Sequence, residues 1–86
     1  MVRLKLAESY LFAKNYHQAS KELDSALGIA NVPDHIKALI FLRRGNASDG
    51  LGHRDAATWD YRRSLQLDAD GVTNQLAKRY LKNPFG

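Results

Sequence analysis

The chain repeats one pattern of residues after 38 positions, and this duplication constrains its fold more than any other feature. When residues 6–27 are shifted by 38 they match residues 44–65, so that Ala7 corresponds to Gly45 and Ala19 to Ala57. Repeats of this length, each built from two helices, are typical of stacked arrays in which every unit buries an apolar face against the next. Such arrays commonly serve as binding surfaces for other proteins.

The spacing of apolar residues predicts five helices, over residues 2–13, 16–28, 33–49, 54–67 and 72–82. No segment alternates apolar and polar residues as a half-buried strand does, so we expect an all-α fold. Asn15 and Gln18 predict a capping box at the start of the second helix. Pro33 and Asp34 suit the first turn of the third helix. The pair Asp70-Gly71 is expected to end the fourth helix.

Small residues in each expected hairpin should let two helix backbones approach closely. Ala7 should therefore meet Ala19, and Gly45 should meet Ala57. A glycine inside a helix costs about 0.5–1 kcal/mol relative to alanine, which close packing would have to return. The larger and smaller side chains expected to complete the two hairpin cores are Tyr10, Leu23, Ala26, Tyr61 and Leu65.

In their order along the chain, these residues resemble the tetratricopeptide repeat. The first copy reads Leu6, Ala7, Tyr10, Tyr16, Ala19, Leu23, Ala26 and Leu27, and the second reads Phe41, Gly45, Leu51, Gly52, Ala57, Tyr61, Ser64 and Leu65. The resemblance implies one domain over 1–86, with repeats at about 3–32 and 37–70 and a capping helix at about 71–82. Its hairpins would stack as a short right-handed α-solenoid.

The chain departs from this family in three respects. Its copies lie 38 residues apart, whereas the family repeat is about 34 residues long. The extra residues fall around 29–35, in the second helix, the linker or the third helix. Ser48 and Ala69 stand where the family prefers a larger apolar residue and a proline.

In this family the first helix of each repeat lines a concave groove that receives a peptide or a partner's helix. The resemblance therefore implies a non-catalytic, scaffold-like binding module of the cytoplasm. Carried over by helical position, the groove residues would be Leu4, Lys5, Glu8, Leu11, Phe12, Leu39, Leu42, Arg43, Asn46 and Asp49.

A co-chaperone-like subset of the family uses such a groove to grip an acidic C-terminal tail. Residues 37–45, KALIFLRRG, resemble the segment that supplies its basic clamp, with Arg43 at the clamp position. However, Lys37 is displaced by two positions from the second clamp residue, and Glu8 would bring negative charge into the groove. Two interpretations of Arg43 therefore remain open. It binds an acidic partner, or it is a solvated residue on the surface of its helix.

Trp59 marks a second candidate interface on the fourth helix, together with Arg62 and Arg63. Tryptophan and arginine are enriched among the residues that contribute most to protein interfaces. The alternative is that Trp59 covers a neighbouring helix or stacks under Arg63. A homodimer through this face or through the strongly apolar first helix is the alternative function, because two repeats alone leave apolar surface to cover.

Other functions find little support in the sequence. The net charge of +4 only mildly favours acidic partners, and the paired basic residues diverge around their helices, so nucleic acid is a weaker alternative. There is no cysteine, and His17, His35 and His53 fall in separate elements, so we expect no enzyme, metal or cofactor site. No apolar run is long enough to cross a membrane. Because the first helix opens without a cap, we expect a piece of a longer array.

Overall fold

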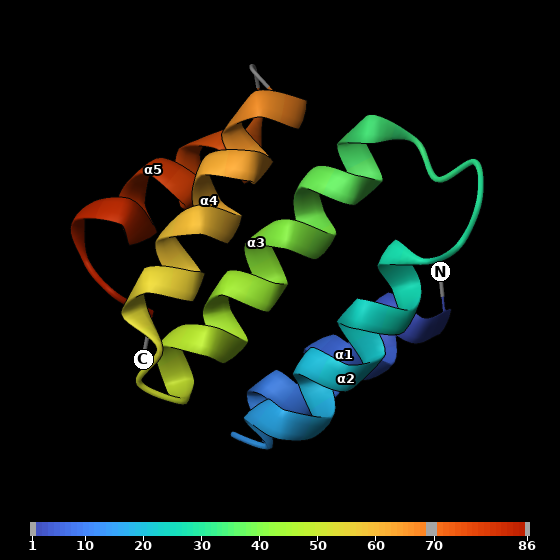
Figure 1. Ribbon diagram of the computed structural model, residues 1–86, viewed down its shortest axis with the longest axis horizontal. Helices are drawn as coiled ribbons and strands as arrows, with labels where there is room; N and C mark the ends of the chain where they lie inside the picture. The colour runs from blue at the N-terminus through green and yellow to red at the C-terminus, as the bar shows by residue number, and fades with distance from the viewer. Residues whose placement is uncertain (1, 69–70, 86) are drawn as a thin grey trace.

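The computed structural model describes residues 2–68 and 71–85, which form five helices joined by short connections (Figure 1). The helices are α1 (Val2–Phe12), α2 (Tyr16–Leu27), α3 (Asp34–Gly50), α4 (Arg54–Leu67) and α5 (Val72–Lys82). These described residues contain no strand, so the all-α prediction is confirmed. The ends of α4 and α5 lie where predicted, and the other helices differ by one residue. The expected roles of Ala69 and Asp70, and the end of the second repeat at residue 70, lie outside the described residues.

The two hairpins turn at the same place in each copy of the repeat. Helices α1 and α3 end at Phe12 and Gly50, which are 38 residues apart, and α2 and α4 begin at Tyr16 and Arg54, again 38 residues apart. The duplication seen in the sequence is therefore a duplication of structure.

The turn of each hairpin contains an equivalent pair of backbone hydrogen bonds. In the first turn the Lys14 N–H donates to the carbonyl of Leu11 at 3.0 Å, and the Asn15 N–H donates to the carbonyl of Tyr10 at 2.8 Å. The residues 38 positions later repeat both bonds at the same two distances. This pair of bonds is the Schellman motif, which ends a helix with a residue of positive φ. That residue is Lys14, with φ 62°, in the first turn and Gly52, with φ 81°, in the second.

The predicted capping box at Asn15 is wrong. The Asn15 side chain makes no capping hydrogen bond, and its ψ of 74° lies well below the extended values typical of a helix N-cap. The preceding Schellman turn fixes the backbone conformation of Asn15. As a result, only the Asn15 carbonyl contributes to the helix, by accepting a hydrogen bond from the Ala19 N–H at 3.1 Å. Pro33 is likewise the N-cap of α3 and not its first residue, whereas Asp34 occupies the first turn as predicted.

The helices form two layers. Each helix packs against the next one along the chain, and α1 also packs against α3, and α3 against α5. Within residues 2–68, α2 and α4 do not pack against each other. Figure 1 shows α2 and α4 nearer the viewer than α1 and α5. The chain is therefore two stacked helix hairpins followed by a fifth helix that covers the second hairpin.

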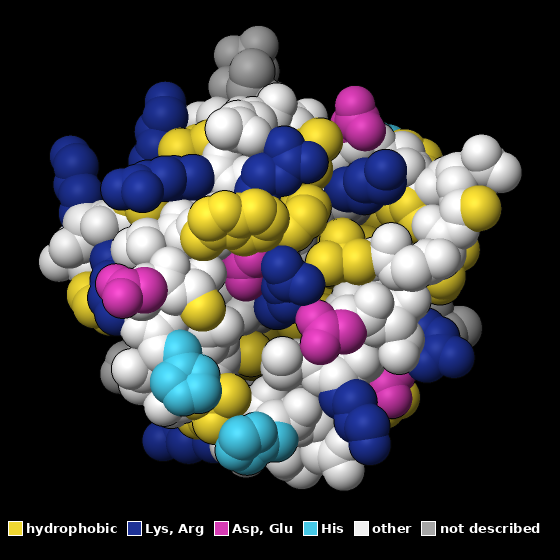
Figure 2. Space-filling model, viewed as in Figure 1, with side chains coloured by type: hydrophobic (Ala, Val, Ile, Leu, Met, Phe, Trp, Pro, Cys, Tyr) yellow, Lys and Arg dark blue, Asp and Glu magenta, His cyan; other side chains and the backbone are white. Residues whose placement is uncertain are grey.

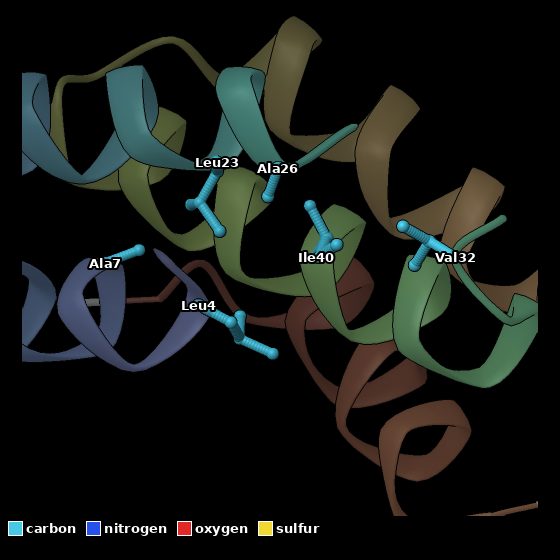
Figure 3. Packing of buried hydrophobic residues seen from close by; sticks show 6 residues of the cluster. All are labelled: Leu4, Ala7, Leu23, Ala26, Val32 and Ile40. Carbon is cyan, nitrogen blue, oxygen red and sulfur yellow. The ribbon is translucent and has the colours of Figure 1, made fainter. Parts of the chain in front are cut away.

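The first hairpin and the start of α3 enclose one hydrophobic core. Figure 3 shows the buried side chains, which are Leu4, Ala7, Leu23, Ala26, Val32 and Ile40. Val32 lies in the linker between α2 and α3, which consists of residues 28–33. Helix α2 ends at Leu27, whereas α4 continues two residues past the matching position. The second helix of the first copy is therefore not lengthened.

Small residues make room for tyrosine rings, an arrangement that the sequence analysis did not predict. A methyl group at Gly45 would lie 2.5 Å from Cε1 of Tyr61, so Gly45 packs against that ring. Gly50, expected in the turn, is the last residue of α3, and a methyl group there would lie 2.5 Å from the Tyr16 ring. Each glycine of α3 thus lets one aromatic ring lie directly on the helix backbone.

The alanines of the first hairpin also differ from the expected arrangement, because they belong to separate cores. Ala7 packs in the core that contains Leu23 and Ala26. Ala19 packs instead with Leu11 and Ala47, near the α1–α2 turn.

Candidate binding groove

Helices α1 and α3 and the C-terminal tail border a hollow of about 240 Å³. Its lining residues are Glu8, Leu11, Phe12, Arg43, Asn46 and Phe85. We call this hollow the groove. Five of its six residues are among those predicted from helical position, so the structure brings together the central part of the predicted site. Phe85 was missed, because it follows the last helix and no helical periodicity places it.

The remaining predicted groove residues lie elsewhere. Leu4 and Leu42 are buried, with 7% and 0% of their surface exposed, so their expected presentation to a partner is corrected. Leu39 is half-buried against the hydrophobic cores. Lys5 is exposed but does not line the groove, and the Asp49 side chain is only 2% exposed. Helices α1 and α3 pack against each other as well as against their hairpin partners, which buries more of their surface than expected.

A row of polar contacts crosses the groove wall. The Arg43 guanidinium donates from Nε to Glu8 Oε2 at 3.1 Å and from Nη1 to Asn46 Oδ1 at 3.2 Å. Asn46 in turn donates to the Tyr61 hydroxyl at 3.1 Å. Since Arg43 and Glu8 both remain partly exposed, their ion pair is worth no more than about 1 kcal/mol. Arg43 is nevertheless already matched by a carboxylate, which disfavours a clamp for an acidic tail.

Below this row lies a buried carboxylate, that of Asp49. It accepts a hydrogen bond from the Tyr61 hydroxyl at 2.6 Å and contacts Arg54 Nη1 at 3.0 and 3.2 Å. Burial raises the pKa of Tyr61 far above its usual range, and the bond to Asp49 raises it further, so the phenol remains a donor. Arg54 also donates from Nη2 to the carbonyls of Tyr80 and Leu81, at 2.8 and 2.9 Å. The network therefore connects the groove to the end of α5.

The predicted second interface lies on the other layer. Trp59 is 56% exposed, and the edge of its ring system meets the ring of Phe41 with centroids 6.0 Å apart. Arg63 lies over the ring of Phe41, 5.6 Å from its centroid, whereas one expected alternative was that Trp59 stacks under Arg63. Arg62 is exposed. Figure 2 shows this face, with apolar surface near its centre and basic and acidic side chains around it.

Beside Trp59, Arg44 joins three helices. It makes a two-point contact with Asp60 at 3.1 and 2.8 Å and contacts Asp24 of α2 at 3.1 Å. The Asp60 side chain is only 4% exposed. Burial raises the pKa of Asp60, and the adjacent Arg44 guanidinium opposes this rise. The bond to Asp60 in turn raises the pKa of Arg44. This arrangement holds α2, α3 and α4 together.

The histidines and the helices of the described residues bear on metal binding and membrane insertion. His17, His35 and His53 are exposed in separate elements. Among residues 2–68 and 71–85, no group of three or more histidine and carboxylate side chains could hold a metal ion. None of the helices in these ranges combines the length and apolar character needed to span a bilayer.

Comparison of the chain with protein-family models, with curated proteins and with solved structures finds no match. The candidate site is therefore defined by the geometry of the groove.

Proposed function

We propose that the chain is a non-catalytic protein-binding module of the tetratricopeptide kind, in which the groove receives an apolar side chain from a peptide or helix of a partner. The observation that carries this proposal is the exposure of Phe12, which has 95% of its surface in contact with solvent at the edge of the groove. Burying a phenylalanine side chain contributes about 1.5–3 kcal/mol, which is a sufficient contribution for one anchoring contact.

The repeated hairpins support this proposal. Both turns make the same hydrogen bonds, and α1, α3 and α5 share one layer, as the first helices of successive repeats would. The groove lies on that layer, between the two helices that the family uses for binding. The resemblance and the geometry therefore favour the same surface.

The charges of the groove favour an apolar contact over an acidic one. Arg43 is paired with Glu8, so a partner carboxylate would have to displace an existing ion pair. Phe12 instead offers exposed apolar surface to a partner side chain, beside the largely buried Leu11. We therefore expect apolar contacts to supply most of the affinity.

A displayed library of random twelve-residue peptides tests the proposal. We expect selection on the wild-type chain to enrich peptides with a shared apolar position. These peptides should bind Phe12→Ala at least about tenfold more weakly, which corresponds to about 1.4 kcal/mol. Because Phe12 is exposed, this substitution leaves the fold intact. Ile29→Ala, which shortens another exposed apolar side chain in the α2–α3 linker, is the matched control and should bind as wild type does. If no peptide is enriched, or if the selected peptides bind Phe12→Ala as well as wild type, the proposal is wrong.

Self-association is a second candidate function, and the exposure of both Phe12 and Trp59 favours it. A homodimer that covers either side chain should appear in sedimentation velocity as a concentration-dependent increase in mass. Phe12→Ala or Trp59→Ala should abolish that increase, depending on which face is covered. A monomer throughout the micromolar to millimolar range would rule this candidate out.

A further inference from the structure

The C-terminal tail already occupies part of the groove. After α5 the backbone becomes extended at Asn83, with φ −129° and ψ 115°. The Phe85 N–H then donates to Asp49 Oδ2 at 3.1 Å, and the Phe85 ring meets the Tyr80 ring edge to face, with centroids 5.6 Å apart. The same Phe85 lines the groove together with Phe12. The end of the chain thus presents an aromatic side chain and a backbone donor to this surface.

The carboxylate that holds the tail does not depend on it. Arg54 balances the charge of Asp49, and the Tyr61 hydroxyl donates to the same oxygen as the tail, at 2.6 Å. The tail contributes the longest of the three contacts to Oδ2. Removing it therefore leaves the buried Asp49 paired with its cation, which avoids the penalty of an uncompensated buried charge.

The end of α5 is also held independently of the tail. Arg54 Nη2 donates to the carbonyls of Tyr80 and Leu81, in the last turn of the helix. The side chains of Leu76, Tyr80 and Leu81 pack against the core that contains Tyr61. Helix α5 therefore remains in place when the residues after it leave the groove.

We propose that residues 83–85 are a resident ligand of the groove, which a partner must displace. This proposal rests on the proposed function and names the chemistry of the partner. The partner is an extended peptide segment with an aromatic side chain that enters beside Phe12 and a backbone N–H that donates to Asp49, as Phe85 does. A short tether gives the tail a high effective concentration, so the tail competes with any free peptide.

A peptide that copies the tail tests this proposal. The probe is an acetylated peptide of residues 82–86, Lys-Asn-Pro-Phe-Gly, and its control carries alanine in place of phenylalanine. Each peptide is titrated into the 86-residue chain, as wild type and as Phe85→Ala, while NMR follows the amide signals of Leu11 and Phe12. Val72→Ala, which shortens an exposed apolar side chain at the start of α5, is the matched control variant.

We expect the probe to bind Phe85→Ala more tightly than wild type, and a gain of about tenfold would correspond to a tail bound about nine-tenths of the time. Val72→Ala should keep the wild-type affinity, and the alanine peptide should not bind. Equal affinity of the probe for wild type and Phe85→Ala would overturn the resident-ligand proposal. Absence of binding to Phe85→Ala would overturn it as well.

Peptides selected from the displayed library separate this proposal from the proposed function. Selected peptides that need Phe12 but bind wild type and Phe85→Ala equally would sustain the proposed function and overturn the resident tail. If the tail probe binds Phe85→Ala about tenfold more tightly than wild type but no library peptide is selected, the resident tail is supported and the proposed function is overturned. If both hold, a selected peptide bound to wild type should remove the nuclear Overhauser contacts between the rings of Tyr80 and Phe85.

Discussion

Replacing Gly45 with alanine should destabilise the chain, although alanine is the better helix former. Gly45 lies in the interior of α3, where alanine is favoured over glycine by about 0.8–1 kcal/mol. The new methyl group, however, would lie 2.5, 2.8 and 3.0 Å from three carbon atoms of the Tyr61 ring. Reaching an ordinary contact of 3.4 Å with the nearest atom requires a shift of about 0.9 Å, the difference between these two distances.

The ring cannot accept this shift freely. Tyr61 has no exposed surface, and its hydroxyl is held between Asp49 at 2.6 Å and Asn46 at 3.1 Å. Overpacking a core costs about 1–3 kcal/mol, and a hydrogen bond to a charged group contributes about 1.5–3 kcal/mol. If strain and a weakened bond together cost about 3 kcal/mol, subtracting the helix gain of about 1 kcal/mol leaves a net loss of about 2 kcal/mol.

Urea unfolding followed by circular dichroism measures this loss, and thermal unfolding should show a midpoint lowered by roughly 8–16 °C. Gly28→Ala is the matched control. Gly28 has a helical backbone with φ −80°, and its new methyl group would meet only one carbonyl oxygen, at 3.5 Å. This control should be neutral or slightly stabilising.

A second background isolates the cause. Tyr61→Phe removes the hydroxyl that anchors the ring, so the additional cost of Gly45→Ala should be smaller in that background than in wild type. If Gly45→Ala leaves the free energy of unfolding unchanged or raises it, the close contact between Gly45 and Tyr61 does not exist in solution. An equal cost in both backgrounds would show that the hydroxyl does not restrain the ring.

Two further pairs of substitutions test the charge and turn arrangements. Arg44→Ala should lower the free energy of unfolding by about 3–5 kcal/mol because it leaves the buried Asp60 carboxylate without its partner, whereas Arg43→Ala should cost about 1 kcal/mol or less. Similar losses for both variants in urea unfolding would refute this distinction. Lys14→Gly should stabilise the chain by up to about 1 kcal/mol because Lys14 has a φ of 62° that glycine adopts without strain. Asn31→Gly, at a second non-glycine residue with φ 62°, should gain less because asparagine tolerates this region, and an equal gain at both sites would contradict the argument.

Helical periodicity was sufficient to place the helices and most of the groove. The helical spacing of apolar residues located the five described helices, including α3, which packs against all four of the others. The same positional argument found Glu8, Phe12 and Arg43, since residues at matching positions of α1 and α3 face the same side of the layer. Leu42 shows the limit of this argument, because its position on the helix does not reveal that α5 also covers it.

Contacts between side chains of separate helices could not be predicted from the sequence. Arg44 and Asp60 lie 16 residues apart, and their contact depends on how far α4 is displaced along α3. The packing of Gly45 against Tyr61 depends on the same offset, which no pattern within one helix reveals. Phe85 reaches the groove through a nonhelical segment, whose path is set by Asp49 and Tyr80 and not by any local periodicity.

The 38-residue spacing between the copies has a practical consequence for anyone redesigning the chain. An engineer who deleted residues 29–32 to restore the usual length of a repeat would remove Val32, which is only 9% exposed and belongs to the first core. The linker would then no longer close the end of that core, and Ile40 and Leu23 would gain access to water. The longer spacing is therefore a structural part of the first hairpin, and a shortened chain would need a new apolar side chain to replace Val32.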